Sequence, residues 1–85
     1  MESYRLLIKP SAAKELETIP RIDRARIVAK IGALSTHPRP PGCEKLSTQE
    51  QYRIRQGRYR VVYAISDAEK TVLVVKVGHR REVYR

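Results

Sequence analysis

The stretch TVLVVKVG, from Thr71 to Gly78, constrains the fold of this chain more than any other. It is almost continuously apolar and rich in β-branched residues, which favour β-strands. A strand of this kind has no polar face to turn to water, so it needs strands on both sides and cover on both faces. A chain of 85 residues has room for one small core. We therefore predict a single domain, residues 1–85, whose sheet surrounds this strand.

Two helices are predicted between a first strand and a proline-rich loop. The first strand covers residues 4–9 and ends at Pro10, and Ser11 is placed to cap a helix over residues 11–19. A second helix is predicted over residues 21–35, where apolar residues occupy a wider sector than one sheet contact requires. Part of this helical hairpin is therefore expected to remain available to a partner.

The second half of the chain is predicted to form a hairpin and a further strand. Residues 37–50 contain three prolines and a glycine without a sustained period, and are expected to form a loop. Strand-like runs follow at residues 52–56, 58–66 and 71–78. The order β-α-α-β-β-β predicts an α+β fold, a four-stranded antiparallel sheet with an N-terminal strand and an α-helical hairpin packed on the sheet.

The chain is strongly basic. Its 18 lysines and arginines against 9 acidic residues give a formal net charge of +9, which predicts a polyanionic partner: nucleic acid first, an acidic protein second. Cys43 is the single cysteine, so no intrachain disulfide can form. The apolar run at residues 6–8 is too short for a signal peptide or a membrane span. We expect a cytoplasmic protein with no membrane partner.

Residues 52–63, YRIRQGRYRVVY, place four arginines on two adjacent strands. Alternation puts Arg53 and Arg55 on one face of the first strand and Arg60 on one face of the second. If these three side chains meet on one side of the sheet, they form a field of fixed positive charge. Arginines on a sheet face also keep a protein soluble. Lysines would do so equally well, and residues 52–63 contain no lysine. The planar fork of arginine matches phosphate oxygens, which favours RNA or DNA as the ligand.

The chain resembles the RelE-type toxins of bacterial and archaeal toxin–antitoxin pairs, in the superfamily that also contains the gyrase-poisoning ParE toxins. The resemblance covers almost the whole chain and rests on KPSAAKELE, PPGCEKL, YRIRQGRYRVVYAI and the ending VGHRREVYR. It implies cleavage of messenger RNA in the ribosomal A site, without a metal or other cofactor. It also implies inhibition by a cognate RelB-like antitoxin, with the toxin monomeric alone and part of a higher-order complex with the antitoxin.

The resemblance further implies roles for single residues. Arg53 and Arg55 match basic residues that hold the RNA backbone, and Arg60 matches an arginine that contacts the scissile phosphate. In the tail, Arg80 matches a catalytic arginine, and Tyr84 matches a tyrosine that stacks on a base and takes part in proton transfer. The predicted catalytic residues are Arg55, Arg60, Arg80 and Tyr84, and the predicted RNA-binding residues are Lys45, Arg53, Arg58, His79 and Arg81. No residue is predicted to bind a metal.

The proton-transfer groups stay open at this point. Attack by the ribose 2′-OH needs a base, charge stabilisation and an acid, and arginine answers only the second need, because a pKa above about 12 makes it a poor proton acceptor. Tyr84 and His79 are the first candidates for the base, although His79 is equally well explained as a packed residue at a strand end. Glu50 and Glu82 are further candidates, and each is better explained as offsetting the charge of neighbouring arginines. Either Arg80 or Arg81 can take the role of the catalytic arginine. The alternative function is that of a ParE-like gyrase inhibitor, which acts by binding and needs no arginines converging on a phosphate.

Overall fold

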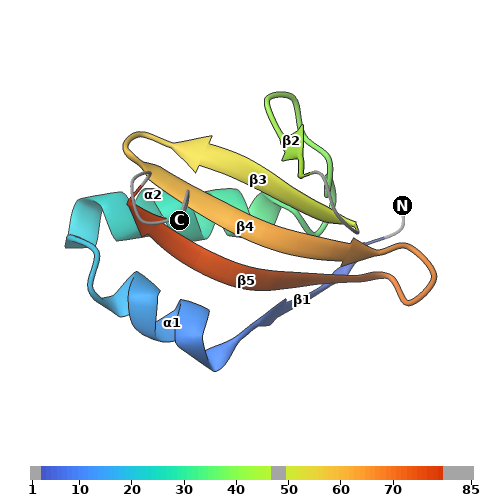
Figure 1. The fold of residues 1–85 in the computed structure, drawn as a ribbon, viewed down its shortest axis with the longest axis horizontal. Helices are drawn as coiled ribbons and strands as arrows, with labels where there is room; N and C mark the ends of the chain where they lie inside the picture. Colours follow the sequence, from blue (N-terminus) through green and yellow to red (C-terminus); the bar gives the residue numbers. More distant parts are fainter. Residues whose placement is uncertain (1–2, 47–49, 80–85) are drawn as a thin grey trace.

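A computed structural model of the chain describes residues 3–46 and 50–79 (Figure 1). The elements follow in the order β1 (Arg5–Ile8), α1 (Pro10–Glu17), α2 (Arg21–Ala33), β2 (Glu44–Lys45), β3 (Gln51–Gln56), β4 (Tyr59–Ser66) and β5 (Thr71–His79). The strands lie in the order β1-β5-β4-β3-β2, and α2 runs behind this sheet in Figure 1. The predicted α+β class, with an N-terminal strand and helices on a sheet, is confirmed. Neither helix in the described ranges is long and apolar enough to cross a membrane.

The sheet is mixed and has five strands, where four antiparallel strands were expected. β1 runs parallel to β5, with Ile8 opposite Val74, while the other neighbouring strands pair antiparallel. A parallel pair needs a long connection, and here helices and strands separate β1 from β5. The extra strand, β2, has two residues and lies inside the segment predicted to be a loop. Two residues are too few for any periodicity to appear in the sequence.

β5 is an interior strand with a neighbour on each edge, as its sequence predicted. It lies between β1 and β4, and its residues Val72 and Val74 are fully buried. The predicted cover on both faces is only partial, because Leu73 on the outer face is partly exposed.

β1 ends opposite Val74, so the second half of β5 needs another partner on that edge. Glu15 of α1 supplies it: one carboxylate oxygen accepts a hydrogen bond from the Val77 backbone N–H at 3.0 Å, and the other from Lys76 Nζ at 2.9 Å. The helix therefore continues the edge that β1 leaves uncovered.

The two helices supply one side of the core. α1 begins at Pro10 after Lys9, and no side chain caps it, so the predicted capping role of Ser11 was wrong. Proline suits the first turn because its φ is preset and its missing N–H would have had no partner there. In α2, Ile27 is fully buried against the sheet, whereas Ile22 on the same helix is 69% exposed. Part of the apolar helical sector is thus left uncovered, as expected.

The strands divide their side chains between two faces. Core residues Tyr52 and Ile54 of β3 lie opposite Tyr63 and Val61 of β4, and all four pack with the helices. Residues that alternate with them point to the other side of the sheet, which we call the outer face. Arg53, Arg55 and Arg60 all belong to the outer face.

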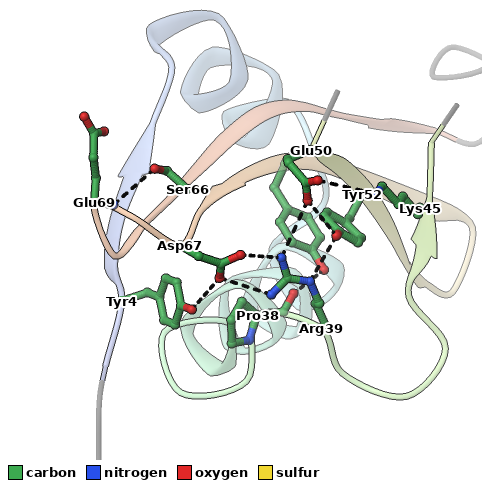
Figure 2. A network of polar contacts seen from close by, with 10 residues as sticks. Tyr4, Pro38, Arg39, Lys45, Glu50, Tyr52, Ser66, Asp67 and Glu69 are labelled. Atoms are coloured by element: carbon green, nitrogen blue, oxygen red, sulfur yellow. Dashed lines mark hydrogen bonds and ion pairs between the residues drawn. The ribbon is translucent and has the colours of Figure 1, made fainter. Parts of the chain in front are cut away.

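A polar network joins four separate segments around Arg39 (Figure 2). The guanidinium of Arg39 donates two hydrogen bonds to the Asp67 carboxylate, at 3.2 and 2.8 Å, and a third to the Tyr52 hydroxyl at 3.0 Å. The Tyr4 hydroxyl donates to the same Asp67 at 2.6 Å, and the Tyr52 hydroxyl donates to Glu50 at 3.0 Å. The network ties the chain before β1, the loop after α2, the start of β3 and the β4–β5 turn together.

The same contacts fix the loop that follows α2. The buried Tyr63 hydroxyl donates to the backbone carbonyl of Pro38 at 2.7 Å, and burial raises the pKa of Tyr63, which keeps the phenol protonated as a donor. Hydrogen bonds from Arg39 and Tyr4 lower the pKa of Asp67 from 3.8 to about 2. The carboxylate therefore holds Arg39 in place over nearly the whole accessible pH range.

Replacing Asp67 by Asn should lower the Tm of the protein near neutral pH, because Arg39 loses its charged partner. A carboxyl whose pKa is depressed on folding stabilises the fold above its unfolded pKa, and this contribution disappears as the pH falls through the folded value. The Tm difference between wild type and Asp67→Asn should therefore shrink between pH 3.8 and about 2 in thermal unfolding followed by circular dichroism.

Glu69→Gln is the matched control, since Figure 2 shows this side chain on the same turn pointing away from the network. It should leave the Tm close to that of the wild type at every pH. A Tm difference for Asp67→Asn that stays constant down to pH 2 would contradict the assigned role of the carboxylate.

Candidate functional site

The β3–β4 hairpin positions the arginines of the outer face. Its loop consists of two residues, Gly57 and Arg58, and only Gly57 has a positive φ, of 60°. A glycine with positive φ at the first loop position is typical of a type II′ turn, whose twist matches that of paired strands. This tight turn sets the register, in which Arg55 lies directly opposite Arg60 and Arg53 opposite Val62. The three arginines therefore lie on the same face of the sheet, as strand alternation predicted.

Arg55 and Arg60 form the centre of the site. Their positions face each other across the two strands, an arrangement that destabilises a sheet when both side chains carry the same charge. The two side chains differ in exposure: Arg60 is 4% exposed and donates to the Tyr59 carbonyl at 3.4 Å, while Arg55 is exposed to solvent. Within residues 3–46 and 50–79, no carboxylate forms an ion pair with Arg55. One guanidinium is thus held in place and the other is accessible.

Of the other predicted RNA-binding residues of this region, Arg53 belongs to the outer face and Arg58 to the turn. Lys45 lies opposite the core residue Tyr52, and therefore on the helical side of the sheet, away from the arginines. Arg53 forms an ion pair with Glu44 of β2 at 3.0 Å, and the two residues are direct neighbours across the β2–β3 pair. Lys45 is exposed and pairs with Glu50 at 3.4 Å. Arg58 occupies the exposed turn itself. Their roles in RNA binding stay predictions.

The end of β5 divides the predicted tail residues into two groups. Gly78 lies opposite Arg60 and contributes no side chain beside the guanidinium. His79 lies opposite Tyr59, with the two rings edge to face at 5.9 Å, and it borders a cavity shared with α1 residues Lys14 and Glu15. Strand alternation therefore places His79 on the helical side, away from the arginines. The predicted residues Arg80, Arg81 and Tyr84 lie outside the described part of the chain.

Two residues of the site carried no signal in the sequence. Glu44, which neutralises Arg53, lies in a segment without any period. Lys30 of α2 donates a hydrogen bond from Nζ to the backbone carbonyl of Arg55 at 3.0 Å, from 25 positions earlier in the chain. Neither contact can be inferred before the helix and β2 are placed against β3, because both partners come from distant segments.

The arrangement suits electrostatic binding of phosphate groups. Arginine forks on a strand are fixed donors for phosphate oxygens, and they stabilise the negative charge that develops during attack on a phosphodiester. In the ranges 3–46 and 50–79, histidine, cysteine and carboxylate side chains form no group that is able to hold a metal ion. The groups that the outer face offers to a ligand are the guanidinium groups of Arg53, Arg55 and Arg60.

Comparison with known proteins finds the same fold and related sequences. The curated toxin RelG of Mycobacterium tuberculosis is 32% identical over 87 residues, which cover 96% of this chain and 97% of RelG. The crystal structure of the RelBE2 toxin–antitoxin complex from Mycobacterium tuberculosis contains a chain that is 28% identical, with a TM-score of 0.80 and coverage of 92% of this chain and 99% of that chain.

A third similar protein is an E. coli RelE toxin in which two arginines are replaced by alanine. Its structure was solved in the free state. Its sequence is 29% identical to this chain, with a TM-score of 0.81 and coverage of 96% of this chain and 90% of that chain. The family model described as "ParE toxin of type II toxin-antitoxin system, parDE" matches residues 6–84. A match over nearly the full length, on a fold shared with RelE, places the chain in the ParE/RelE family of toxins of type II toxin–antitoxin systems.

Proposed function

We propose that this toxin is a ribosome-dependent endoribonuclease that cleaves messenger RNA in the A site by attack of a ribose 2′-OH on the adjacent phosphodiester. The proposal is supported by relatives named RelG and RelE and by the arginines of the outer face. Membership of the ParE/RelE toxin family rests on the family match and does not depend on this activity.

The pair of Arg55 and Arg60 is the observation that carries the proposal. Two arginines directly opposite each other place two positive charges side by side on the hairpin. An RNA phosphate has oxygens that match both guanidinium forks. A role in solubility does not explain why Arg60 is only 4% exposed.

The two arginines act at different stages in this mechanism. Arg55 is exposed and meets the RNA backbone first. Arg60 is 4% exposed, so the phosphate reaches its guanidinium only after a local rearrangement, and it then stabilises the charge of the pentacovalent transition state. Arg80 or Arg81 adds a further cation, and Tyr84 remains the candidate for proton transfer. The ribosome supplies alignment of the 2′-OH with the leaving oxygen, which is worth roughly 7–11 kcal/mol.

We also propose a RelB-like antitoxin as the inhibiting partner. Solved relatives include RelB–RelE complexes, among them those of E. coli and Pyrococcus horikoshii. A chain of net charge +9 attracts an acidic segment, and the exposed Ile22 and Val28 of α2 offer apolar anchoring points. A partly disordered acidic segment that folds on the toxin fits both features.

Inhibition of DNA gyrase by binding is the second candidate function. It is favoured by one observation, the description of the matching family model as a ParE toxin. A supercoiling assay with purified gyrase separates the two functions. Loss of supercoiling, with messages left intact on ribosomes, would replace the ribonuclease proposal.

The purified toxin should cleave a message in a ribosome with an open A site at least about a thousandfold faster than the same RNA in solution, because alignment accounts for more than that factor. The measurement is single-turnover cleavage of one labelled message with and without ribosomes. Equal rates in the two reactions would overturn the ribosome-dependent mechanism.

Replacing Arg60 by Lys should slow ribosome-dependent cleavage by 100-fold or more, since loss of one preorganised donor raises such a barrier by about 2.7–4 kcal/mol. Lysine keeps the charge but not the planar fork. Because Arg60 is buried, the Tm of the variant must be measured alongside its rate. The control is Arg26→Lys on the exposed surface of α2, which should cleave at the wild-type rate. A folded Arg60→Lys toxin with full activity would contradict the role of Arg60.

Arg53 and Arg55 should differ in the salt dependence of RNA binding. The logarithm of the RNA association constant falls as the logarithm of the salt concentration rises, and each lost phosphate contact makes this fall less steep by about one unit. We expect this change for Arg55→Ala. Arg53→Ala should produce a smaller change, because Glu44 already neutralises Arg53. In a Glu44→Gln background, Arg53→Ala should show the larger change. Fluorescence anisotropy with a labelled RNA measures these slopes, and identical slopes for all variants would assign the arginines to solubility.

A further inference from the structure

The last four residues of β5, residues 76–79, have a strand along one edge only. β1 ends opposite Val74, and a β-bulge at Val75 follows. Beyond this bulge, only β4 pairs with β5 in the described part of the chain. We call residues 76–79 the β5 end. A strand end of this kind opens more easily than the interior of a sheet, because water competes for its backbone groups.

The β5 end lies beside the part of β4 that carries Arg60. Gly78 lies directly opposite Arg60, and His79 lies opposite Tyr59. The guanidinium of Arg60 donates a hydrogen bond to the Tyr59 carbonyl at 3.4 Å, and the rings of Tyr59 and His79 meet edge to face at 5.9 Å. The position of Arg60 therefore depends on whether the β5 end stays paired with β4.

Side-chain packing secures the β5 end only in part. Val77 is buried in the core, but a cavity of about 410 Å³ lies between α1 and the β5 end. It is bordered by Lys14 and Glu15 on the helix and by Gly78 and His79 on the strand. Atoms beside a cavity lack contacts on one side, so these residues gain less from packing than the rest of the core does.

Glu15 bridges the helix and the strand at this place. One carboxylate oxygen accepts a hydrogen bond from the Val77 N–H at 3.0 Å, and the other accepts one from Lys76 Nζ at 2.9 Å. The first bond satisfies a backbone donor that no strand of the described chain reaches. A hydrogen bond to an ionised carboxylate is also stronger than one between neutral groups. Glu15 therefore does for the β5 end what β1 does for the first half of β5.

We propose that Glu15 is a positioning residue of the toxin, which holds the Val77 N–H, keeps the β5 end on β4 and thereby fixes Arg60 for the scissile phosphate. The proposal rests on the ribonuclease function proposed above, in which Arg60 stabilises the charge of the transition state. A preorganised donor is effective only while its geometry is fixed. A displacement of about 1 Å that originates far from the reacting atoms can slow a reaction about 100-fold.

Two substitutions of Glu15 and one matched control test the proposal. Glu15→Ala removes both hydrogen bonds and keeps a high helix propensity, so we expect α1 to form. Glu15→Gln keeps a carbonyl oxygen for the Val77 N–H and loses the ion pair with Lys76. The control is Glu17→Ala, at an exposed position two residues later and therefore on the opposite side of α1.

Two measurements are made on each variant. Single-turnover cleavage on ribosomes at increasing toxin concentration gives the maximal rate and the half-saturating toxin concentration. Amide hydrogen exchange of the free toxin, followed by NMR, reports on the Val77 N–H directly and needs no activity. The Tm of each variant sets the temperature of both measurements, which must lie well below the lowest Tm.

Glu15→Ala should lower the maximal rate by about tenfold to 100-fold. The half-saturating concentration should stay unchanged, because Arg53 and Arg55 lie on β3, away from Glu15. Glu15→Gln should recover most of the rate, and Glu17→Ala should equal the wild type. In Glu15→Ala, the Val77 amide should exchange about tenfold faster than in the wild type, while the amides of β3 keep their rates.

Three results would overturn the proposal. If Glu15→Ala lowers the Tm but cleaves at the wild-type rate, or raises only the half-saturating concentration, Glu15 does not position Arg60. If Glu15→Gln is as slow as Glu15→Ala, the contact with the Val77 N–H is not the one that matters. If the Val77 amide exchanges equally in Glu15→Ala and the wild type, Glu15 does not hold it. Absence of ribosome-dependent cleavage by the wild type would instead reject the proposed function itself.

Discussion

The pairing of β5 on both of its edges is the constraint on which the other parts of this structure depend. Val72, Val74 and Val77 of β5 are buried in the core on the helical side. β4 lies along one edge of β5, while β1 and then Glu15 of α1 cover the other. The chain between β1 and β5 contains both helices, and they pack on one side of the sheet. The opposite side is left to the arginines of the β3–β4 hairpin.

The outer face depends on the placement of β3. A two-residue turn fixes the register of β3 against β4, and the very short β2 covers only part of its other edge. In this register Arg55 lies opposite Arg60 and is the accessible member of the pair. The Arg39 network ties the loop after α2 to the start of β3 and to the β4–β5 turn, so interactions remote from the arginines hold the strands that carry them.

Much of this site was predictable because strand alternation has a fixed period of two. That period alone places Arg53, Arg55 and Arg60 on one face of the sheet. The same period counted along β5 from Val72 and Val74 would put His79 on the outer face. The β-bulge at Val75 shifts the alternation, so that His79 lies beside Tyr59 on the helical side, and the sequence alone does not reveal this bulge. The ion pair of Arg53 with Glu44 was not predictable, since β2 is too short to leave a pattern.

The sequence by itself determined the order of the elements apart from the two-residue β2, the interior position of the strand over residues 71–78 and the positive charge of the hairpin. These properties follow from local periodicity, proline positions and composition, each of which acts over a few neighbouring residues. Only the tertiary structure decided that β1 runs parallel to β5, that Arg60 is buried while Arg55 is exposed, and that Lys30 reaches the edge of β3. These features arise from contacts between segments distant in the chain, and no local pattern encodes which distant partners will meet.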